Sequence, residues 1–506
     1  MKIYRLLGVV LLAGLSKGYS PAVQQQPSQQ QGNSLFDRSY NLSQQLNGSE
    51  RLIYLAELTD ISTQIQPPPQ KAELWTFDLL HVASQEQNQH QRIAGSKTAL
   101  DRLSFFDPSL ALAGLSELEL QSPDAKGMLG EDLRSDAAED IFANYLTKVQ
   151  PTDLNAVYET ARYLGRTGQY PYHAASTVAA KLSPAKADAI NTLLNDSLSF
   201  YSQETGFYNR DEEFLKALKD FAKNPAVDQK LMKRALSEYV RRLTHEGISI
   251  PWNYYGELHT PQGKILPFKD RNLKFLCEVL PIIQRFDGDL AKQIRHDYPE
   301  VSGATENMRY ISGGFIRDLP TSSEESFQKH LKWIEESTLD EMRKHRDSPE
   351  YITGLSKHLT GEGARVVALS WTVPGIAKKN RIQAQDIFSS QRKKLDSITD
   401  DADRLRAMVA LAQAASFVCN KTEFESITAQ AINAGKNLFA NEEPVRTQTR
   451  EQLRELVSFA AAQPGGALDN DIQQLKQDDW FKAYLELYEA EGRAKASQNS
   501  VKDCSK

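Results

Sequence analysis

The chain has 506 residues and a formal net charge of -6, from 60 basic and 66 acidic side chains. Hydrophobic residues make up 40% of the sequence, which is enough for sizeable buried cores over this length. A mildly acidic chain without a basic stripe argues against nucleic acid as the main partner.

Residues 1–22 have the charge and hydropathy pattern of a secretory signal peptide. Lys2 and Arg5 precede an apolar run over residues 6–15, and small and polar residues follow it. Cleavage before Val23, or at the rival site over residues 16–18, would release an exported chain, periplasmic or secreted; the alternative is a buried N-terminal helix. No later stretch contains the roughly 18 uninterrupted apolar residues of a membrane helix, so we expect no membrane span in the mature chain.

The remainder is predicted to be helical between two polar segments. Residues 23–33 are rich in glutamine and are expected to form a linker. Beyond them, apolar residues recur at spacings of three and four between caps, prolines and glycines, which predicts short helices. Irregular stretches near the middle divide an N-terminal array, 34–320, from a C-terminal array, 321–493. The tail, 494–506, is predicted to be disordered.

The clearest unit is a helical hairpin over residues 400–439. Asp400 is placed to cap its first helix, and Thr422 is expected to start the second by a capping box with Glu425. The first helix carries an apolar face at Leu405, Met408, Ala412, Ala415 and Cys419. The second carries one at Phe424, Ile427, Ala431, Ala434 and Leu438. Each face must be covered by neighbouring hairpins.

This hairpin resembles a tetratricopeptide-like helical repeat. The resemblance rests on Leu411, Ala412 and Ala415 in the first helix and on Ala431 and Ile432 in the second, where small residues let helices approach closely. The resemblance implies an α-solenoid architecture and no particular activity.

Residues 248–268 interrupt the helical pattern. A turn signal at residues 260–263, flanked by aromatic and β-branched residues, predicts a small β-hairpin inserted between helices. Just before the turn lie the candidate binding residues Trp252, Asn253, Tyr254, Tyr255 and Glu257. Exposed aromatic side chains with polar neighbours can stack on a sugar or anchor a protein partner. The alternative, that they pack the hairpin onto the helices, stays open.

The sequence contains no motif that marks an enzyme. It lacks a nucleophile elbow, a phosphate-binding glycine loop and a zinc-binding helix, so we predict no catalytic residue, metal site or cofactor. The adjacent pair Glu335 and Glu336 is expected to splay over a helix surface rather than to converge. Cys277 and Cys419 are predicted to be buried thiols, which leaves Cys504 as the candidate reactive or intermolecular thiol.

The fold is therefore predicted to be all-α, a solenoid or array of stacked helical hairpins with one small β-hairpin insertion. The favoured function is an exported non-enzymatic scaffold that binds a protein or peptide partner, and it predicts an elongated particle. The alternative is a secreted α/α-barrel enzyme acting on carbohydrate. That enzyme predicts a closed ring with Asp or Glu side chains converging at one end.

Overall fold

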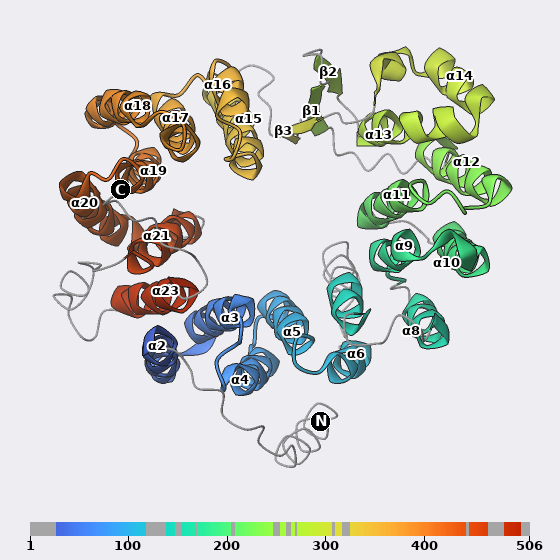
Figure 1. Cartoon of the computed structure of the whole chain (residues 1–506). Coiled ribbons are helices and arrows are strands. Elements are labelled where there is room, and N and C mark those ends of the chain that lie inside the picture. Colours follow the sequence, from blue (N-terminus) through green and yellow to red (C-terminus); the bar gives the residue numbers. More distant parts are fainter. Residues whose placement is uncertain are drawn as a thin grey trace.

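The computed structural model describes residues 27–117, 138–146, 154–166, 170–203, 208–245, 254–259, 265–268, 271–305, 309–315, 324–441, 445–463 and 480–496. Over these residues the chain is a series of stacked helices with one small sheet (Figure 1). Within the described ranges, no helix is both long enough and apolar enough to cross a membrane.

The N-terminal part of the chain forms short helices joined by tight connections. They are α2 Pro27–Ser43, α3 Gly48–Gln64, α4 Ala72–Gln85, α5 Gln89–Leu103, α6 Pro108–Glu117, a helix over 138–146, α8 Leu154–Arg166, α9 Tyr172–Lys181, η2 Pro184–Lys186, α10 Ala187–Gln203, α11 Tyr208–Phe221 and α12 Gln229–His245. The boundary expected at residue 33 falls inside α2.

The rest of the chain adds three strands and a second series of helices. They are β1 Tyr254–His259, β2 Ile265–Phe268, α13 Arg271–Phe286, α14 Gly288–Asp297, η3 Pro299–Gly303, β3 Arg309–Phe315, α15 Glu324–Lys344, α16 Pro349–Ser356, α17 Glu362–Ala377, α18 Arg381–Lys394, η5 Leu395–Ser397, α19 Asp401–Phe417, α20 Lys421–Phe439, α21 Val445–Ala461 and α23 Trp480–Ala496.

The helices follow a ring rather than an open stack (Figure 1). Helices α9, α11 and α13 lie on the inner side, with α10, α12 and α14 outside them, and α17 and α19 alternate with α18 and α20 in the same way. Helices α2 and α23, from opposite ends of the described chain, pack together. The first and last described helices therefore meet, which contradicts the elongated particle expected of an open stack.

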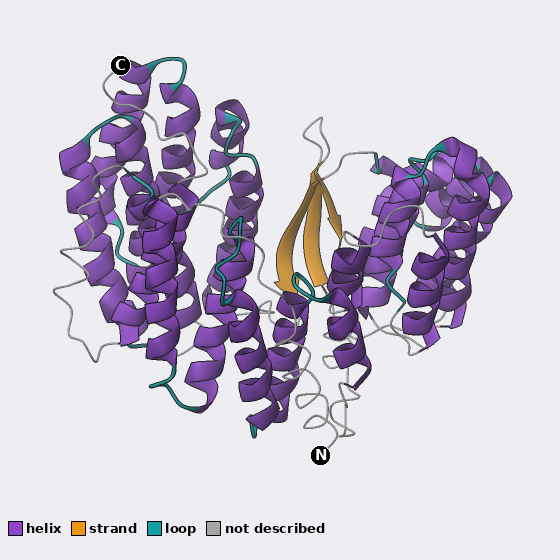
Figure 2. Cartoon of the chain, turned by 60° about the horizontal axis from the view of Figure 1, so that its bottom comes forward, coloured by secondary structure: helices purple, strands orange, loops and turns teal. Residues whose placement is uncertain are grey.

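A small sheet lies between two stacks of helices (Figure 2). Strand β1 is central and pairs antiparallel with β2 on one side and with β3 on the other. Strand β3 comes from the second irregular stretch of the sequence, beyond residues 248–268, and it packs against α15. Strand β2 contacts α13 and η3, so the sheet lies between these two elements and α15.

The hairpin over 400–439 forms for the reasons that its sequence indicates. Asp400 caps α19, because its Oδ1 accepts a hydrogen bond from the amide of Asp403 at 2.9 Å. The cap of α20 differs from the expectation. Its N-cap is Asn420, whose side chain accepts from the amide of Glu423 at 3.2 Å, so the helix starts one residue before Thr422.

Cys419 corrects one prediction. It adopts a left-handed backbone conformation, with φ of 59°, in the turn between α19 and α20, and it is disulfide-bonded rather than a buried thiol. Cys277 is buried and free, as expected. Burial raises the pKa of the Cys277 thiol to about 12, so this thiol remains protonated at neutral pH. Cys504 lies outside the described residues.

Three hydrophobic cores hold the ring together. One runs from Leu100 to Ala304 and a second from Leu339 to Leu456. The third core joins the two ends of the chain, because residues between Phe36 and Ala99 pack with residues between Ile432 and Ala494. The two predicted arrays thus share a core.

Helix α23 closes the ring through aromatic contacts and buried hydrogen bonds. The Tyr54 hydroxyl donates to the carbonyl of Ala483 at 3.0 Å, and its ring lies edge-on to Tyr484 with centroids 4.9 Å apart. The Tyr488 hydroxyl donates to Glu57 at 2.7 Å. On the other side, Gly492 lets α23 approach α21, since a Cβ there would overlap the carbonyl of Ser458.

We predict that alanine substitution at two helical glycines changes the stability of the protein in opposite directions. Gly354→Ala should stabilise the protein by up to ~1 kcal/mol, because no atom lies within 4 Å of the added carbon and alanine favours helix. Gly492→Ala should destabilise it by roughly 1–3 kcal/mol, because the added carbon pushes α23 from α21. Thermal and chemical denaturation of both variants tests this, and stabilisation by Gly492→Ala would contradict the close approach.

Candidate functional site

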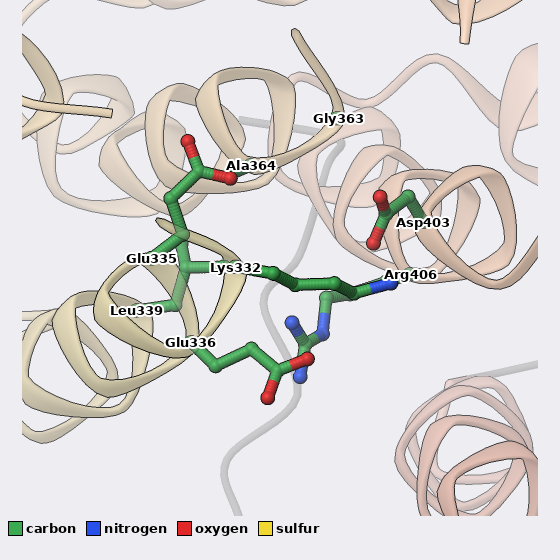
Figure 3. Close-up of a pocket in the computed structure, with 8 residues that line it drawn as sticks. All are labelled: Lys332, Glu335, Glu336, Leu339, Gly363, Ala364, Asp403 and Arg406. Carbon is green, nitrogen blue, oxygen red and sulfur yellow. The ribbon is translucent and has the colours of Figure 1, made fainter. Parts of the chain in front are cut away.

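A charged pocket lies where α15 meets the N-terminal ends of α17 and α19 (Figure 3). It is a shallow pocket, with an enclosed volume of about 20 Å³. It is lined by Lys332, Glu335, Glu336, Leu339, Gly363, Ala364, Asp403 and Arg406. The four residues from α15 recur at spacings of three, one and three, which places them on one face of that helix.

Glu335 is engaged as a cap of α17. Its Oε1 accepts hydrogen bonds from the amide of Thr360 at 2.5 Å, from the hydroxyl of Thr360 at 2.8 Å and from the amide of Gly361. A carboxylate is favoured there by the open amides and the positive end of the helix dipole. A Cβ at position 361 would approach Glu335 Oε2 to 2.7 Å, so a larger residue there would require the Glu335 carboxylate to shift. Glu335 therefore joins α15 to α17.

The surroundings of the pocket shift the pKa of Asp403. Burial raises the pKa of its carboxyl group above the ordinary range, and the neighbouring carboxylates of Asp400 and Glu335 act in the same direction. The positive charges of Lys332 and Arg406 partly offset this rise. Asp403 stands in the first turn of α19.

Arg406 and Glu336 give the pocket unpaired charges of both signs. Within the described part of the chain, neither side chain forms a hydrogen bond or an ion pair within 4.0 Å, although Arg406 acts electrostatically on Asp403. Lys332 is exposed and reaches Asp400 only at 3.9 Å. Because Glu336 belongs to α15 and Arg406 to α19, the pocket can bind a group that carries both signs, or two groups of opposite sign.

The residues predicted from sequence lie elsewhere. Trp252 and Asn253 fall outside the described residues. Tyr254, Tyr255 and Glu257 belong to β1, whose backbone pairs with the two neighbouring strands. None of the five is among the residues that line the pocket.

Glu335 and Glu336 both line the pocket. Their carboxylates point apart rather than converge, as expected for adjacent residues on a helix (Figure 3). The signal that could have identified them is the set Lys332, Glu335, Glu336 and Leu339, which mixes charges with a buried apolar residue on one helix face. Among the described side chains, no group of three or more His, Cys, Asp or Glu residues could hold a metal ion.

Replacement of Asp403 should stabilise the protein at neutral pH. A carboxyl group whose folded-state pKa is raised opposes folding once the pH exceeds its unfolded pKa, so its cost is present at pH 7 and disappears in acid. Asp403→Asn should therefore raise the melting temperature at pH 7 more than at pH 3.5. Asp401→Asn, at an exposed position in the same helical turn, is the control. Equal shifts for the two variants at pH 7 would contradict the burial of Asp403.

No protein-family model matches this chain, and no curated protein matches it. The likeness of residues 400–439 to a tetratricopeptide-like hairpin thus rests on the residues of that hairpin and on the stacked helices around it. A function for this chain is therefore inferred from the geometry of the charged pocket.

Proposed function

We propose that this protein is an exported, ring-shaped scaffold that binds a polypeptide partner at the charged pocket. The observation that carries the proposal is the presence of Arg406 and Glu336 in one pocket without ion-pair partners among the described residues. A polypeptide offers acidic and basic side chains and charged termini, so it can satisfy both. Complementary charges of this kind confer specificity and accelerate association.

The ring supports this proposal because it fixes the positions of the pocket residues before any partner binds. Asp400 caps α19, Glu335 caps α17, and both α17 and α19 pack into one hydrophobic core with α15. A preorganised site loses less conformational entropy on binding than a flexible one. Closure of the ring therefore favours binding, because the pocket is already formed in the unbound protein.

The alternative, a secreted α/α-barrel enzyme acting on carbohydrate, is favoured by the closed ring and by three carboxylates around one pocket. Two features count against it. Glu335 is occupied by the amides of Thr360 and Gly361, and no aromatic side chain lines the pocket to stack on a sugar. The enclosed volume of the pocket, about 20 Å³, is far below that of pockets that hold a sugar.

Peptide selection should reveal binding that depends on the pocket charges. Random dodecapeptides displayed on phage would be selected on the purified full chain, and affinities measured by fluorescence anisotropy. Arg406→Ala and Glu336→Ala should each weaken binding about tenfold, as for the loss of a partly desolvated charge pair. Arg234→Ala and Glu451→Ala, which remove exposed charges elsewhere, are the matched controls.

Two results would contradict the scaffold. One is the absence of any selected peptide with measurable affinity. The other is the release of reducing ends from a polysaccharide by the wild-type protein and not by Asp403→Asn, which would establish the enzyme instead. Asp403→Asn preserves the shape of the side chain, so the loss would report on chemistry.

Export is supported by the disulfide at Cys419, because disulfides form and persist in oxidising compartments. We predict that the protein isolated from its native host starts at Val23 and contains a Cys419–Cys504 bond, since Cys277 is free. Non-reducing peptide mass spectrometry and N-terminal sequencing would measure both. An intact Met1 together with a reduced Cys419 would overturn export.

A further inference from the structure

A second concave surface, separate from the charged pocket, lies in the groove between α19 and α20. Its empty volume is about 780 Å³. Met408 and Leu438 form an apolar floor, because both line the groove and are almost fully buried. Gln430, Asn433 and Asn437, which we call the amide row, line it from α20.

The amide row is exposed and only partly engaged. Gln430 donates a hydrogen bond to the hydroxyl of Ser426 at 3.1 Å. The side chains of Asn433 and Asn437 make no hydrogen bond to any other described residue, so their donors and acceptors face the groove and solvent. A carboxamide carries both a donor and an acceptor, so it can form two hydrogen bonds with the C=O and N–H of one residue in an extended chain, which point to the same side.

The spacing of this row fits an extended chain. Asn433 and Asn437 are four residues apart on a helix and hence about 6 Å apart along its axis. Alternate residues of an extended polypeptide are about 6.6 Å apart, and their backbone groups point the same way. Asn433 and Asn437 can therefore contact the backbone groups of alternate residues, while an aliphatic side chain of the bound segment reaches the apolar floor.

We propose that the groove between α19 and α20 binds an extended polypeptide segment, with Asn433 and Asn437 hydrogen-bonding its backbone. The inference rests on the proposed function, for which it names the conformation of the partner and a second contact site. A peptide suits the groove better than a glycan does, because none of its lining residues is aromatic and its floor is aliphatic. Binding of a glycan in the same groove is the alternative outcome of the test.

The test uses the selected dodecapeptides and the double variant Asn433→Ala with Asn437→Ala. Affinity should fall at least tenfold in this variant and stay unchanged in the control, Asn155→Ala with Gln383→Ala, which removes two exposed helical amides elsewhere. N-methylation of single peptide amides should weaken binding to the wild-type chain and have no further effect on the double variant at the contacted positions. Melting temperatures would confirm that both variants fold.

The outcomes separate this inference from the proposed function. If peptides bind and only the Arg406→Ala and Glu336→Ala variants weaken them, the scaffold stands and the groove is overturned. If the double variant loses affinity but N-methylation of the peptide weakens binding equally in the wild-type chain and in the double variant, recognition of the peptide backbone is overturned. Binding of the wild-type chain on a glycan array that is lost in the double variant would replace the peptide by a sugar. If no peptide binds, both proposals fail.

Discussion

The ring depends on Arg454, whose side chain connects the two ends of the chain. Its guanidinium contacts Asp60 of α3 at 2.9 Å and Glu491 of α23 at 2.9 and 3.0 Å. Burial by itself would raise the pKa of Glu491, but the hydrogen bonds and charge of Arg454 outweigh burial and lower it. Such a network adds little net stability, because desolvation offsets attraction. Its value is geometric, since a planar guanidinium satisfies both carboxylates in only one alignment of α3, α21 and α23.

The next residue along α21 transmits this alignment to the pocket. Glu455 accepts hydrogen bonds from Arg343 at 2.6 Å, from Arg346 at 2.8 Å and from Gln413 at 3.1 Å. Arg343 belongs to α15 and Gln413 to α19, which are two of the three helices that form the pocket. Adjacent residues on a helix point about 100° apart, so Arg454 can face the closing helices while Glu455 faces the pocket helices. Closure of the ring and geometry of the pocket are thus fixed by the same turn of α21.

What could be predicted from sequence was local. The caps, the helical spacing and the stacked hairpins follow from residues within a few positions of one another, as Asp400 and Asp403 show. Closure could not be predicted, because it joins Tyr54 to Ala483 across 429 positions, and no periodicity encodes that contact. The interruption of the repeat predicts a binding site at Trp252 and its neighbours. The charged pocket is instead formed by charged residues within regular helices. In the sequence these residues look like a solvent-exposed helix face, because the sequence does not show which helices pack beside them.

The two proposed contact surfaces share the first two turns of α19. Asp403 and Arg406 line the charged pocket, whereas Arg404 and Met408 line the groove, because residues two positions apart project about 200° from each other around a helix. One polypeptide that crosses this end of α19 can therefore place a charged group on one side and its extended backbone on the other. The cap at Asp400 orients both sets of side chains at once. A partner that contacts both surfaces would gain from the short connection between them, since the second contact becomes intramolecular once the first has formed.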